Sequence, residues 1–530
     1  MTILEAHHIK QSIKDRELFS IENLAVHSKD RIGLVGKNGS GKTTLLNLLA
    51  GKSQPEQGTI QMYTSVELLP QLKEKRDQKS GGEVTQAYIV EALKKQTGLL
   101  LADEPTTNLD TAHIEWLEKQ LSHWQGALII VSHDRNFLDK LCNVIWEIDE
   151  KSLQIYSGNY TAYRRQKEKE IEKQRLAYEH YQQKRQQLER AIEKKEQKAQ
   201  RATKTPKSKI GSTEESLKGA KPYFAKKQKK LQKTSKALET RLDNLEKVEK
   251  VREAAPLKMT LSNQARLQQK IILRIEDLEG AVPGKQLWKK ASLNIKGGDK
   301  IGIIGPNGAG KTTLVKKIMQ GDAGITLNPS VKIGYFKQDL STLNSEKSIL
   351  ENVKETSKQD ETLIRTVLAR LHFYRDDVFK PVHVLSGGEQ VKVAFAKLFV
   401  SDINMLILDE PTNYLDIEAV EALEGLLQAY EGTVLFVSHD RQFIENIATK
   451  VIEINHQQLT FFEGNIQQFQ EEPAQKESQE DPTEQQLMII ETKITEILSK
   501  LSLEPSNELD QEFQKLLQQK RMLLNQQKKG

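Results

Sequence analysis

Short apolar runs, each followed at once by glycine, acidic or polar residues, predict buried β-strands in two parts of the chain. In the first part these runs occupy residues 32–35, 98–102 and 129–131, and leucines at helical spacing follow the first run. The same order begins again near residue 271. Strands that alternate with helical segments indicate an α/β fold, so the sequence predicts two α/β domains in tandem.

A different pattern fills the segment between these domains, with apolar residues repeating at seven-residue intervals and one interruption at Arg185. Two such stripes can pack as an antiparallel pair of helices, each of roughly 30–35 residues and about 45–55 Å long. Prolines and glycines between the stripes predict a loop at about residues 200–224. The outward stripe is Ile171, Tyr178, Ile192 and Ala199, and the returning stripe is Phe224, Leu231, Leu238 and Leu245.

These patterns divide the 530 residues of the chain into five parts. The first α/β domain covers residues 1–163, the helical arm 164–262 and the second α/β domain 263–469. An acidic linker that contains prolines follows at residues 470–484. Apolar residues at helical spacing then predict a helical hairpin over residues 485–530.

Charge is distributed unevenly along the chain. Between Arg165 and Lys250 there are 26 Lys and Arg against 13 Asp and Glu, whereas the whole chain has a net charge of +6. A cationic projection on an acidic body is typical of a protein that binds a polyanion. A solvated spacer is the alternative, since runs of charge are often only that.

The chain contains no run of eighteen apolar residues, and its first residues do not have the pattern of a secretory signal. Its single cysteine, Cys142, lies in an apolar stretch and is expected to be buried. One cysteine can form neither an internal disulfide nor a cysteine-based metal site. We therefore expect a cytoplasmic protein that does not span a membrane.

Candidate chemistry begins where the first strand runs into a glycine-rich loop and then a helix. Such a loop binds phosphate, because its backbone N–H groups turn inward and the helix N-terminus carries partial positive charge. Lys42 would contact the β- and γ-phosphates, and Thr43 would bind Mg²⁺. A glycine-rich turn without a ligand is the alternative. The loop consists of Gly36, Lys37, Asn38, Gly39, Ser40, Gly41, Lys42, Thr43 and Thr44.

The next two strands end in residues that suit the same site. Asp103 and Glu104 follow the second strand, where Asp103 would hold Mg²⁺ through water and Glu104 would polarise the attacking water. His133 follows the third strand and is either a sensor of the γ-phosphate or a structural histidine.

Gln71 and the string Ser80-Gly81-Gly82-Glu83 lie between the first two of these strands. Serine followed three residues later by glutamate is also the capping box of a helix, and the two interpretations are compatible. Taken in order, these motifs resemble those of an ABC-type ATPase domain. The resemblance implies that Gln71 completes the Mg²⁺ shell and that the SGGE string binds the γ-phosphate of a nucleotide held by the other domain.

The second part of the chain repeats every one of these motifs, so a second site for ATP and Mg²⁺ is expected with the same roles. Its phosphate loop is Gly305, Pro306, Asn307, Gly308, Ala309, Gly310, Lys311, Thr312 and Thr313. Its other members are Gln338, Ser386, Gly387, Gly388, Glu389, Asp409, Glu410 and His439.

The two copies differ in the stretch between the glutamine and the SGGE string, which is much shorter in the first copy. The first copy is therefore expected to lack most of the helical subdomain that residues 349–373 supply in the second. Both copies carry an aliphatic residue, Ile13 or Val282, near the position where ABC domains often stack an aromatic ring on adenine. Selectivity for the base is expected to be loose, and ATP is implied by the family.

Two ABC domains joined by a long basic helical linker resemble the ABC-F class of ribosome-binding ATPases. Residues 79–85, 101–108, 200–204 and 218–225 are similar to strings of the Vga-type antibiotic resistance proteins. The resemblance implies a monomer that closes on ATP and binds the ribosome at the tRNA exit site. Its arm would reach rRNA and peptidyl-site tRNA near the peptidyl transferase centre. It implies relief of inhibition by lincosamides, streptogramin A and pleuromutilins, with release on hydrolysis.

The arm tip is the part expected to meet rRNA, tRNA or the drug site. An aromatic pair among lysines can stack on bases, although one ring could instead cap the hairpin core. Few apolar side chains in the loop favour an indirect effect on the drug. A housekeeping translation factor of the same class and the ATPase subunit of a drug exporter are the rival functions. The candidate tip residues are Lys204, Lys207, Lys209, Lys218, Lys221, Tyr223 and Phe224.

Overall fold

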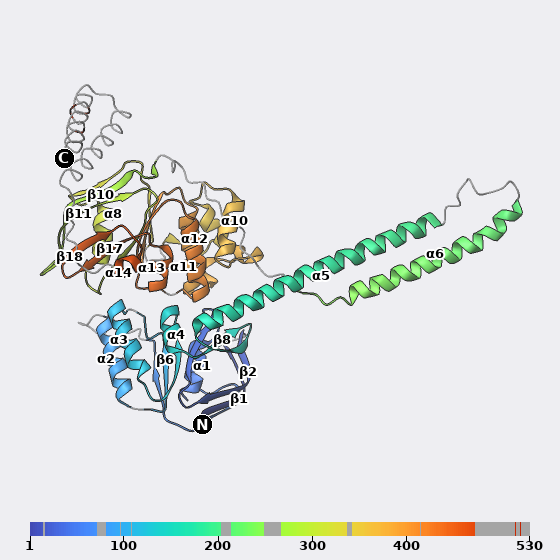
Figure 1. Ribbon diagram of the computed structural model, residues 1–530, viewed down its shortest axis with the longest axis horizontal. Helices are drawn as coiled ribbons and strands as arrows, with labels where there is room; N and C mark the ends of the chain where they lie inside the picture. Colours follow the sequence, from blue (N-terminus) through green and yellow to red (C-terminus); the bar gives the residue numbers. More distant parts are fainter. Residues whose placement is uncertain are drawn as a thin grey trace. The chain divides into compact units, whose positions relative to one another are not determined.

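The computed structural model describes residues 1–13, 16–71, 81–95, 97–107, 109–202, 214–248, 267–336, 342–413 and 415–471, with residues 513, 515 and 520. The chain forms two compact units (Figure 1). One unit comprises Met1–Tyr160 and Ala254–Gly530, and the other is Thr161–Glu253. The first unit holds both repeated domains, here called the first half and the second half, and the second unit is the arm.

The first half is built on two sheets. A three-stranded antiparallel sheet has the order β2-β1-β4, and a six-stranded sheet has the order β5-β6-β7-β3-β8-β9, parallel except for β9. The strands are β1 (Thr2–Ile13), β2 (Arg16–His27), β3 (Arg31–Gly36), β4 (Gln57–Met62), β5 (Val66–Leu69), β6 (Leu99–Asp103), β7 (Ala127–Val131), β8 (Val144–Asp149) and β9 (Ser152–Ser157). The helices are α1 (Lys42–Leu49), α2 (Gly81–Lys94), α3 (Thr111–Ser122) and α4 (Arg135–Leu141).

The second half repeats this plan, with sheets in the order β11-β10-β13 and β14-β15-β16-β12-β17-β18. The prediction of two tandem α/β domains is thus confirmed. The strands are β10 (Ile271–Val282), β11 (Lys285–Lys296), β12 (Lys300–Ile304), β13 (Ile325–Leu327), β14 (Ile333–Phe336), β15 (Met405–Asp409), β16 (Thr433–Val437), β17 (Lys450–Asn455) and β18 (Gln458–Phe462). The helices are α8 (Lys311–Gln320), α9 (Ile349–Lys354), α10 (Glu361–Arg370), α11 (Gly387–Phe399), α12 (Ile417–Ala429), α13 (Arg441–Ile447) and α14 (Ile466–Glu471), with 3₁₀ turns η3 (Arg375–Phe379) and η4 (Val382–Val384).

The central strands are apolar throughout because helices or the small sheet cover both faces. Every residue of β6, β7 and β16 is buried. In the first half α1 and the β1–β2 sheet pack on one face of the large sheet, around the fully buried Trp146. Rigid strand ends follow from this packing, and the candidate site residues lie at those ends.

The two halves differ in the stretch before the SGGE string, as the sequence predicts. Between β14 and β15 the second half carries α9, α10, η3, η4 and α11, which share one core with Phe336 and Phe395. The rings of Phe336 and Phe395 stack with centroids 4.0 Å apart. Between β5 and β6, the described residues of the first half contain only α2. The expected helical subdomain therefore belongs to the second half.

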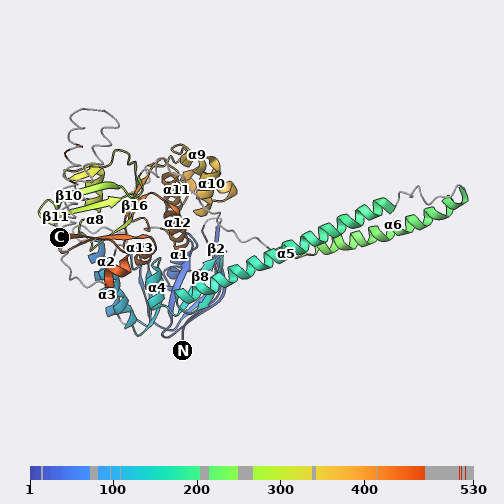
Figure 2. The same cartoon turned by 45° about the horizontal axis from the view of Figure 1, so that its top comes forward.

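The arm is a helical hairpin of α5 (Tyr160–Ala202) and α6 (Glu214–Asp243). Figures 1 and 2 show α6 returning beside α5. The repeat positions Tyr178, Ile192, Leu231 and Leu238 are half-buried, whereas Ile171 is 48% exposed. The seven-residue pattern thus marks the inner side of the hairpin, except at its base.

The predicted loop at residues 200–224 is too long, because α6 already begins at Glu214 and includes Gly219 and Pro222. A proline removes one intrahelical hydrogen bond at a cost of about 3 kcal/mol, and a glycine costs about 1 kcal/mol. The lysines, leucines and alanines that follow favour helix strongly enough to outweigh these two residues.

Two further predictions lie on parts of the chain that are not described. Gln470 and Glu471, the first two residues of the predicted acidic linker at 470–484, belong to α14 instead. The rest of the linker and the helical hairpin at 485–530 fall outside the described residues apart from residues 513, 515 and 520. Among the helices that are described, we find none with enough consecutive apolar residues to cross a membrane.

Cys142 is buried as expected, and burial raises the pKa of its thiol to about 12.

Candidate functional site

The phosphate loop of the first half connects the end of β3 to the start of α1. The Lys42 ammonium folds back over this loop and donates to the carbonyl oxygens of Gly36 (2.6 Å) and Lys37 (3.0 Å). Burial lowers the pKa of Lys42, and nearby Glu104, Asp416 and Asp103 act against that shift. The loop therefore wraps around the buried ammonium group of Lys42, and its backbone N–H groups lie near the N-terminus of α1.

Glycine is required where this loop turns. Gly39 and Gly41 have φ of +76° and +99°, which side chains rarely adopt. A Cβ atom on Gly41 would lie 2.8 Å from the Phe19 ring, whereas one on Gly39 would meet nothing within 4 Å. The loop therefore packs on the β1–β2 sheet at Gly41 and is open at Gly39.

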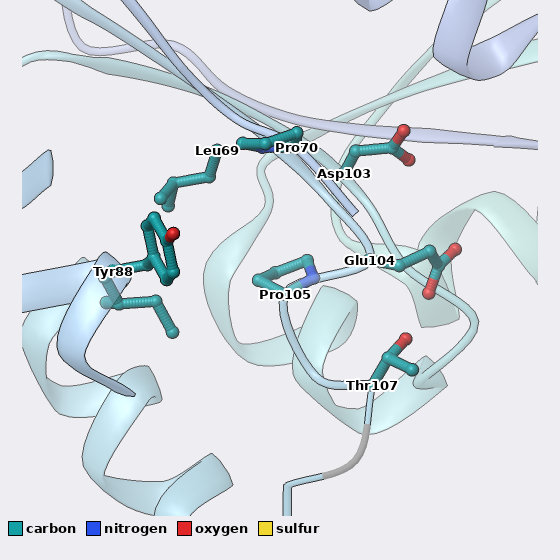
Figure 3. Close-up of a pocket in the computed structure, with 8 residues that line it drawn as sticks. Leu69, Pro70, Tyr88, Asp103, Glu104, Pro105 and Thr107 are labelled. Carbon is teal, nitrogen blue, oxygen red and sulfur yellow. The ribbon is translucent and has the colours of Figure 1, made fainter. Parts of the chain in front are cut away.

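The carboxylates at the end of β6 lie beside the loop. Figure 3 shows the side chains of Asp103 and Glu104 turned to the same side, away from Tyr88. Glu104 has a φ of +51°, and its Oε2 accepts from the backbone N–H of His133 (3.3 Å). Its Oε1 lies 3.2 Å from His133 Nε2. Strands β6 and β7, which are neighbours in the parallel sheet, thus bring Glu104 and His133 together.

Burial changes the charge of this pair. It raises the pKa of Glu104 to about 8, against the attraction of Lys42, and it lowers the pKa of His133 to about 3. Both shifts favour the uncharged form of the side chain, so burial weakens the ionic character of the contact between Glu104 and His133.

These residues line one pocket of about 230 Å³ at the end of the sheet. The pocket combines the predicted phosphate loop, Mg²⁺ ligands and histidine with the aliphatic side chains of Ile13 and Leu18. It is lined by Ile13, Leu18, Asn38, Gly39, Gly41, Lys42, Thr43, Thr44, Gln71, Asp103, Glu104, Val131 and His133. Candidates that are distant in the sequence are thus neighbours in space.

The second half builds the same arrangement. Lys311 Nζ donates to the carbonyl oxygens of Gly305 (2.8 Å) and Pro306 (3.0 Å). The Thr312 hydroxyl donates to Asp409 Oδ1 (3.3 Å), which places two predicted Mg²⁺ ligands in contact.

The glutamate–histidine pair of the second half, Glu410 and His439, matches that of the first. Glu410 has a φ of +49°, and its Oε1 lies 3.4 Å from His439 Nε2. Burial raises the pKa of Glu410 to about 7 and lowers that of His439 to about 4. Gly310 turns against Trp288, as Gly41 turns against Phe19.

Ser386 confirms the capping interpretation of the SGGE string. Its hydroxyl accepts from the Glu389 N–H (3.4 Å) at the start of α11, and Glu389 Oε2 accepts from the Ser386 N–H (2.8 Å). A Cβ atom on Gly387 would meet nothing within 4 Å, so this helix end is open. In the first half, Gly81, Gly82 and Glu83 begin α2, and Ser80 lies outside the described residues.

One aspartate joins each phosphate loop to the other half, a contact that no sequence pattern indicated. Asp416 Oδ2 accepts from the Asn38 N–H (2.9 Å), and Asp110 Oδ2 accepts from the Asn307 N–H (3.0 Å). Each aspartate is also the N-cap of a helix, α12 or α3. The local signal was a Leu-Asp pair present in both halves, Leu109-Asp110 and Leu415-Asp416, which does not reveal a partner distant in the sequence.

Several predicted residues are not placed in a site by the structure. Gln338, Lys204, Lys207 and Lys209 lie outside the described residues. Helix α6, and not a loop, contains the predicted tip residues Lys218, Lys221, Tyr223 and Phe224. Their roles stay predictions.

The residues present fit a nucleotide with a divalent cation. The Ser40 hydroxyl is buried in the loop with no hydrogen-bond partner among the described residues, which suits an atom that meets a ligand. Hydroxyl and carboxylate oxygens of Thr43, Asp103, Thr312 and Asp409 are the hard donors that Mg²⁺ prefers.

Comparison with known proteins agrees with this geometry. A family model described as ABC transporter matches residues 20–68 and 288–413, and another with that description matches 146–222. The chain is 32% identical to the ribosome protection protein VmlR of Bacillus subtilis (strain 168), over 99% of each chain. It is also 32% identical to the erythromycin resistance ATP-binding protein MsrA of Staphylococcus epidermidis, over 86% of this chain and 98% of that protein.

A solved structure described as RNase-L Inhibitor has the same fold. It aligns with a TM-score of 0.54 at 18% identity and covers 85% of this chain and 87% of its own. Paired phosphate loops and carboxylate–histidine pairs, together with relatives matched over almost their full length, establish two nucleotide-binding sites and ATP hydrolysis. The chain belongs to the ABC-F family of ATPases.

Proposed function

We propose that this ATPase is a ribosome-protection factor that binds the ribosome with ATP and leaves after hydrolysis. The observation that carries the proposal is the match to a protein named for ribosome protection over 99% of both chains. The basic arm, which that match includes, supplies a surface suited to RNA. The proposal applies to this chain what the name of its relative states.

The phosphate loops, residues 36–44 and 305–313, hold the triphosphates, with Lys42 and Lys311 on the β- and γ-phosphates. Thr43, Gln71, Asp103, Thr312, Gln338 and Asp409 are the proposed Mg²⁺ ligands. When bound, Mg²⁺ neutralises phosphate charge and favours ionised carboxylates near it. Glu104 and Glu410 then accept hydrogen bonds from the attacking water and orient it. His133 and His439 contact the γ-phosphate.

Each site is completed by the other half. The SGGE strings that begin at Ser80 and Ser386 donate backbone N–H hydrogen bonds to the γ-phosphate held by the phosphate loop of the opposite half. Asp416 and Asp110, which already accept from Asn38 and Asn307, support this arrangement. ATP therefore favours the closed form because it contacts both halves at once, and hydrolysis removes the phosphate that joins them.

On the ribosome, we propose binding at the tRNA exit site with the arm directed toward the peptidyl transferase centre. Tip residues, including Lys221, Tyr223 and Phe224, contact rRNA or peptidyl-site tRNA. Relief of lincosamide, streptogramin A and pleuromutilin inhibition follows from rearranged RNA around the drug. The exposed lysines of α6 support contact with a polyanion, since Lys226, Lys229 and Lys230 are all exposed.

The experiment uses the double variant Glu104→Gln with Glu410→Gln. We expect this variant to stay on ribosomes in ATP through sedimentation, whereas the wild-type protein dissociates. A matched control adds Lys42→Ala and Lys311→Ala, which remove phosphate binding and should abolish retention. Release of the double variant at the wild-type rate would contradict the switch.

A second measurement addresses resistance. Bacteria with and without the gene are compared for growth in a lincosamide, a streptogramin A, a pleuromutilin and erythromycin. A raised inhibitory concentration for any of them supports protection. Ribosome retention together with unchanged susceptibility would make the chain a housekeeping translation factor, and association with membranes instead of ribosomes would favour an exporter subunit.

A further inference from the structure

Arg135, the first residue of α4, makes a buried ion pair with the other half of the chain. Its side chain is 5% exposed, and the guanidinium donates to both carboxylate oxygens of Glu424 on α12, with Nη1 to Oε2 at 3.3 Å. Asn446 Nδ2 donates to the same Oε2 (3.0 Å), and Glu421 lies 3.9 Å away. A bidentate pair of this kind fixes the direction as well as the distance of both side chains.

Arg441, the first residue of α13, makes the corresponding contact in the opposite direction. Its Nη2 lies 3.0 Å from Glu115 Oε1 and donates to the Thr111 carbonyl oxygen (3.0 Å), both on α3. Its Nη1 lies 3.8 Å from Glu118 Oε1, and Glu118 also pairs with Lys140. This contact is more open, since Glu115 is 55% exposed.

Helix α12 therefore touches the first half at two places. Its N-cap Asp416 holds the Asn38 N–H of the phosphate loop, and Glu424 holds Arg135. The two acids are separated by about 12 Å of rigid helix at ~1.5 Å per residue. The position of α12 thus fixes both the phosphate loop and the start of α4 in the same nucleotide site.

Arg135 directly follows His133 and Asp134 in the chain, and hydrogen bonds hold these two residues in place. The neighbouring Asp134 caps α4 by accepting from the Phe137 N–H (3.0 Å), and its own N–H donates to Ser132 Oγ (3.1 Å). Between them, the backbone N–H of His133 donates to Glu104. A displacement of Arg135 would move this N–H and with it the carboxylate that it orients.

We infer that Arg135 and Arg441 are positioning residues, each of which holds the histidine–glutamate pair of its own half in place for hydrolysis. They do so only while each arginine is paired with the acidic residues of the opposite half, on α12 for Arg135 and on α3 for Arg441. The inference concerns ATP hydrolysis and does not need ribosome binding, although it rests on the proposed roles of Glu104 and His133. Because Arg135 is not among the residues that line the pocket of the first half, it affects the chemical step and not nucleotide affinity. Arg135 has the larger effect, since its pair is buried and bidentate.

The test measures ATPase kinetics and nucleotide affinity of the full chain in four proteins: wild type, Arg135→Gln, Glu424→Gln and the double variant. All four proteins also carry Glu410→Gln, so that only the first-half site contributes to turnover. We expect kcat to fall about tenfold to a hundredfold in each variant, because small displacements of reacting groups are costly. The dissociation constant of a fluorescent ATP analogue should change less than about threefold. A fall in kcat without a matching loss of affinity marks an interaction that acts on the chemical step. The double variant should lose no more than either single variant, since both act through one pair.

Controls separate this role from simple stabilisation. Lys317→Gln removes an ion pair of 2.8 Å with Asp322 that lies wholly within the second half, and kcat should not change. Arg441→Gln, tested with Glu104→Gln in place of Glu410→Gln so that only the second-half site turns over, should lower kcat less than Arg135→Gln. A lower thermal midpoint with unchanged kcat, or equal losses of kcat and affinity, would overturn the inference. If Glu104→Gln leaves kcat unchanged, the proposed catalytic role fails instead, whatever the arginine variants show.

Discussion

Single residues set the conformation of the phosphate loop, and two glycines there can be compared directly. Gly39→Ala introduces backbone strain alone, at a cost of about 1–2 kcal/mol, because its Cβ would be free. Gly41→Ala adds a contact of 2.8 Å with Phe19, so its cost should exceed that of Gly39→Ala. Thermal unfolding of the nucleotide-free protein measures the order. Equal midpoints would contradict the packing of the loop on the β1–β2 sheet.

The buried carboxyl of Glu104 predicts a pH dependence of stability. Its folded pKa of about 8 lies above the ordinary 4.5, so the folded state holds this proton between those values and the unfolded state does not. The resulting stability is present at low pH and is lost as the pH rises toward 8. Glu104→Gln removes the dependence, and at pH 8 it should stabilise the nucleotide-free protein by at least about 1 kcal/mol.

The measurement is the thermal midpoint of wild type and Glu104→Gln from pH 5 to pH 8. The difference between them should widen with pH. The exposed Glu22→Gln serves as the control for removal of one negative charge. Parallel curves would show that Glu104 titrates normally in the folded protein.

At the level of elements, two helices with matching caps can separate structure from chemistry. Ser348 caps α9 with the same capping box as Ser386 on α11, and each is completed by glutamate at the third helical residue. Substitution of either serine by alanine should cost about 1 kcal/mol of stability. Only Ser386→Ala should also lower ATPase activity, because α11 is proposed to meet the γ-phosphate. Equal activities of the two variants would leave Ser386 as a helix cap alone.

Elements also show how far the sequence could predict this structure. Local patterns were sufficient for the strands that end in Gly36, Asp103 and Val131, because a buried strand and a glycine loop each have a local cause. The predicted start of α6 was wrong because the turn propensities of Gly219 and Pro222 are outweighed by a longer run of helix-forming residues. Contacts such as Arg135 with Glu424 could not be predicted, since their partners are distant in the sequence and nothing local distinguishes them from surface charges.

For the whole molecule, the charge on the arm predicts how binding depends on salt. Lys229, Lys230 and Lys233 are exposed on α6, so their replacement by glutamine removes phosphate contacts without disturbing a core. Ribosome affinity should fall, and the slope of its logarithm against that of salt should decrease by up to about 2–3. Basal ATPase activity should not change.

Arginine at the same three positions is the matched control, because it keeps the charge and should keep the slope. Sedimentation with ribosomes across a salt series gives both quantities. An unchanged slope in the glutamine variant would mean that this side of α6 does not touch RNA.

The lone thiol of Cys142 has a practical consequence. It is 5% exposed and holds its proton well above neutral pH, so maleimide reagents should leave it unmodified in the folded protein. A pair of cysteines introduced at exposed positions, one at Thr234 on the arm and one at Glu431, would then carry the only fluorophores. Energy transfer between those dyes can follow the chain through a catalytic cycle without first removing a native residue.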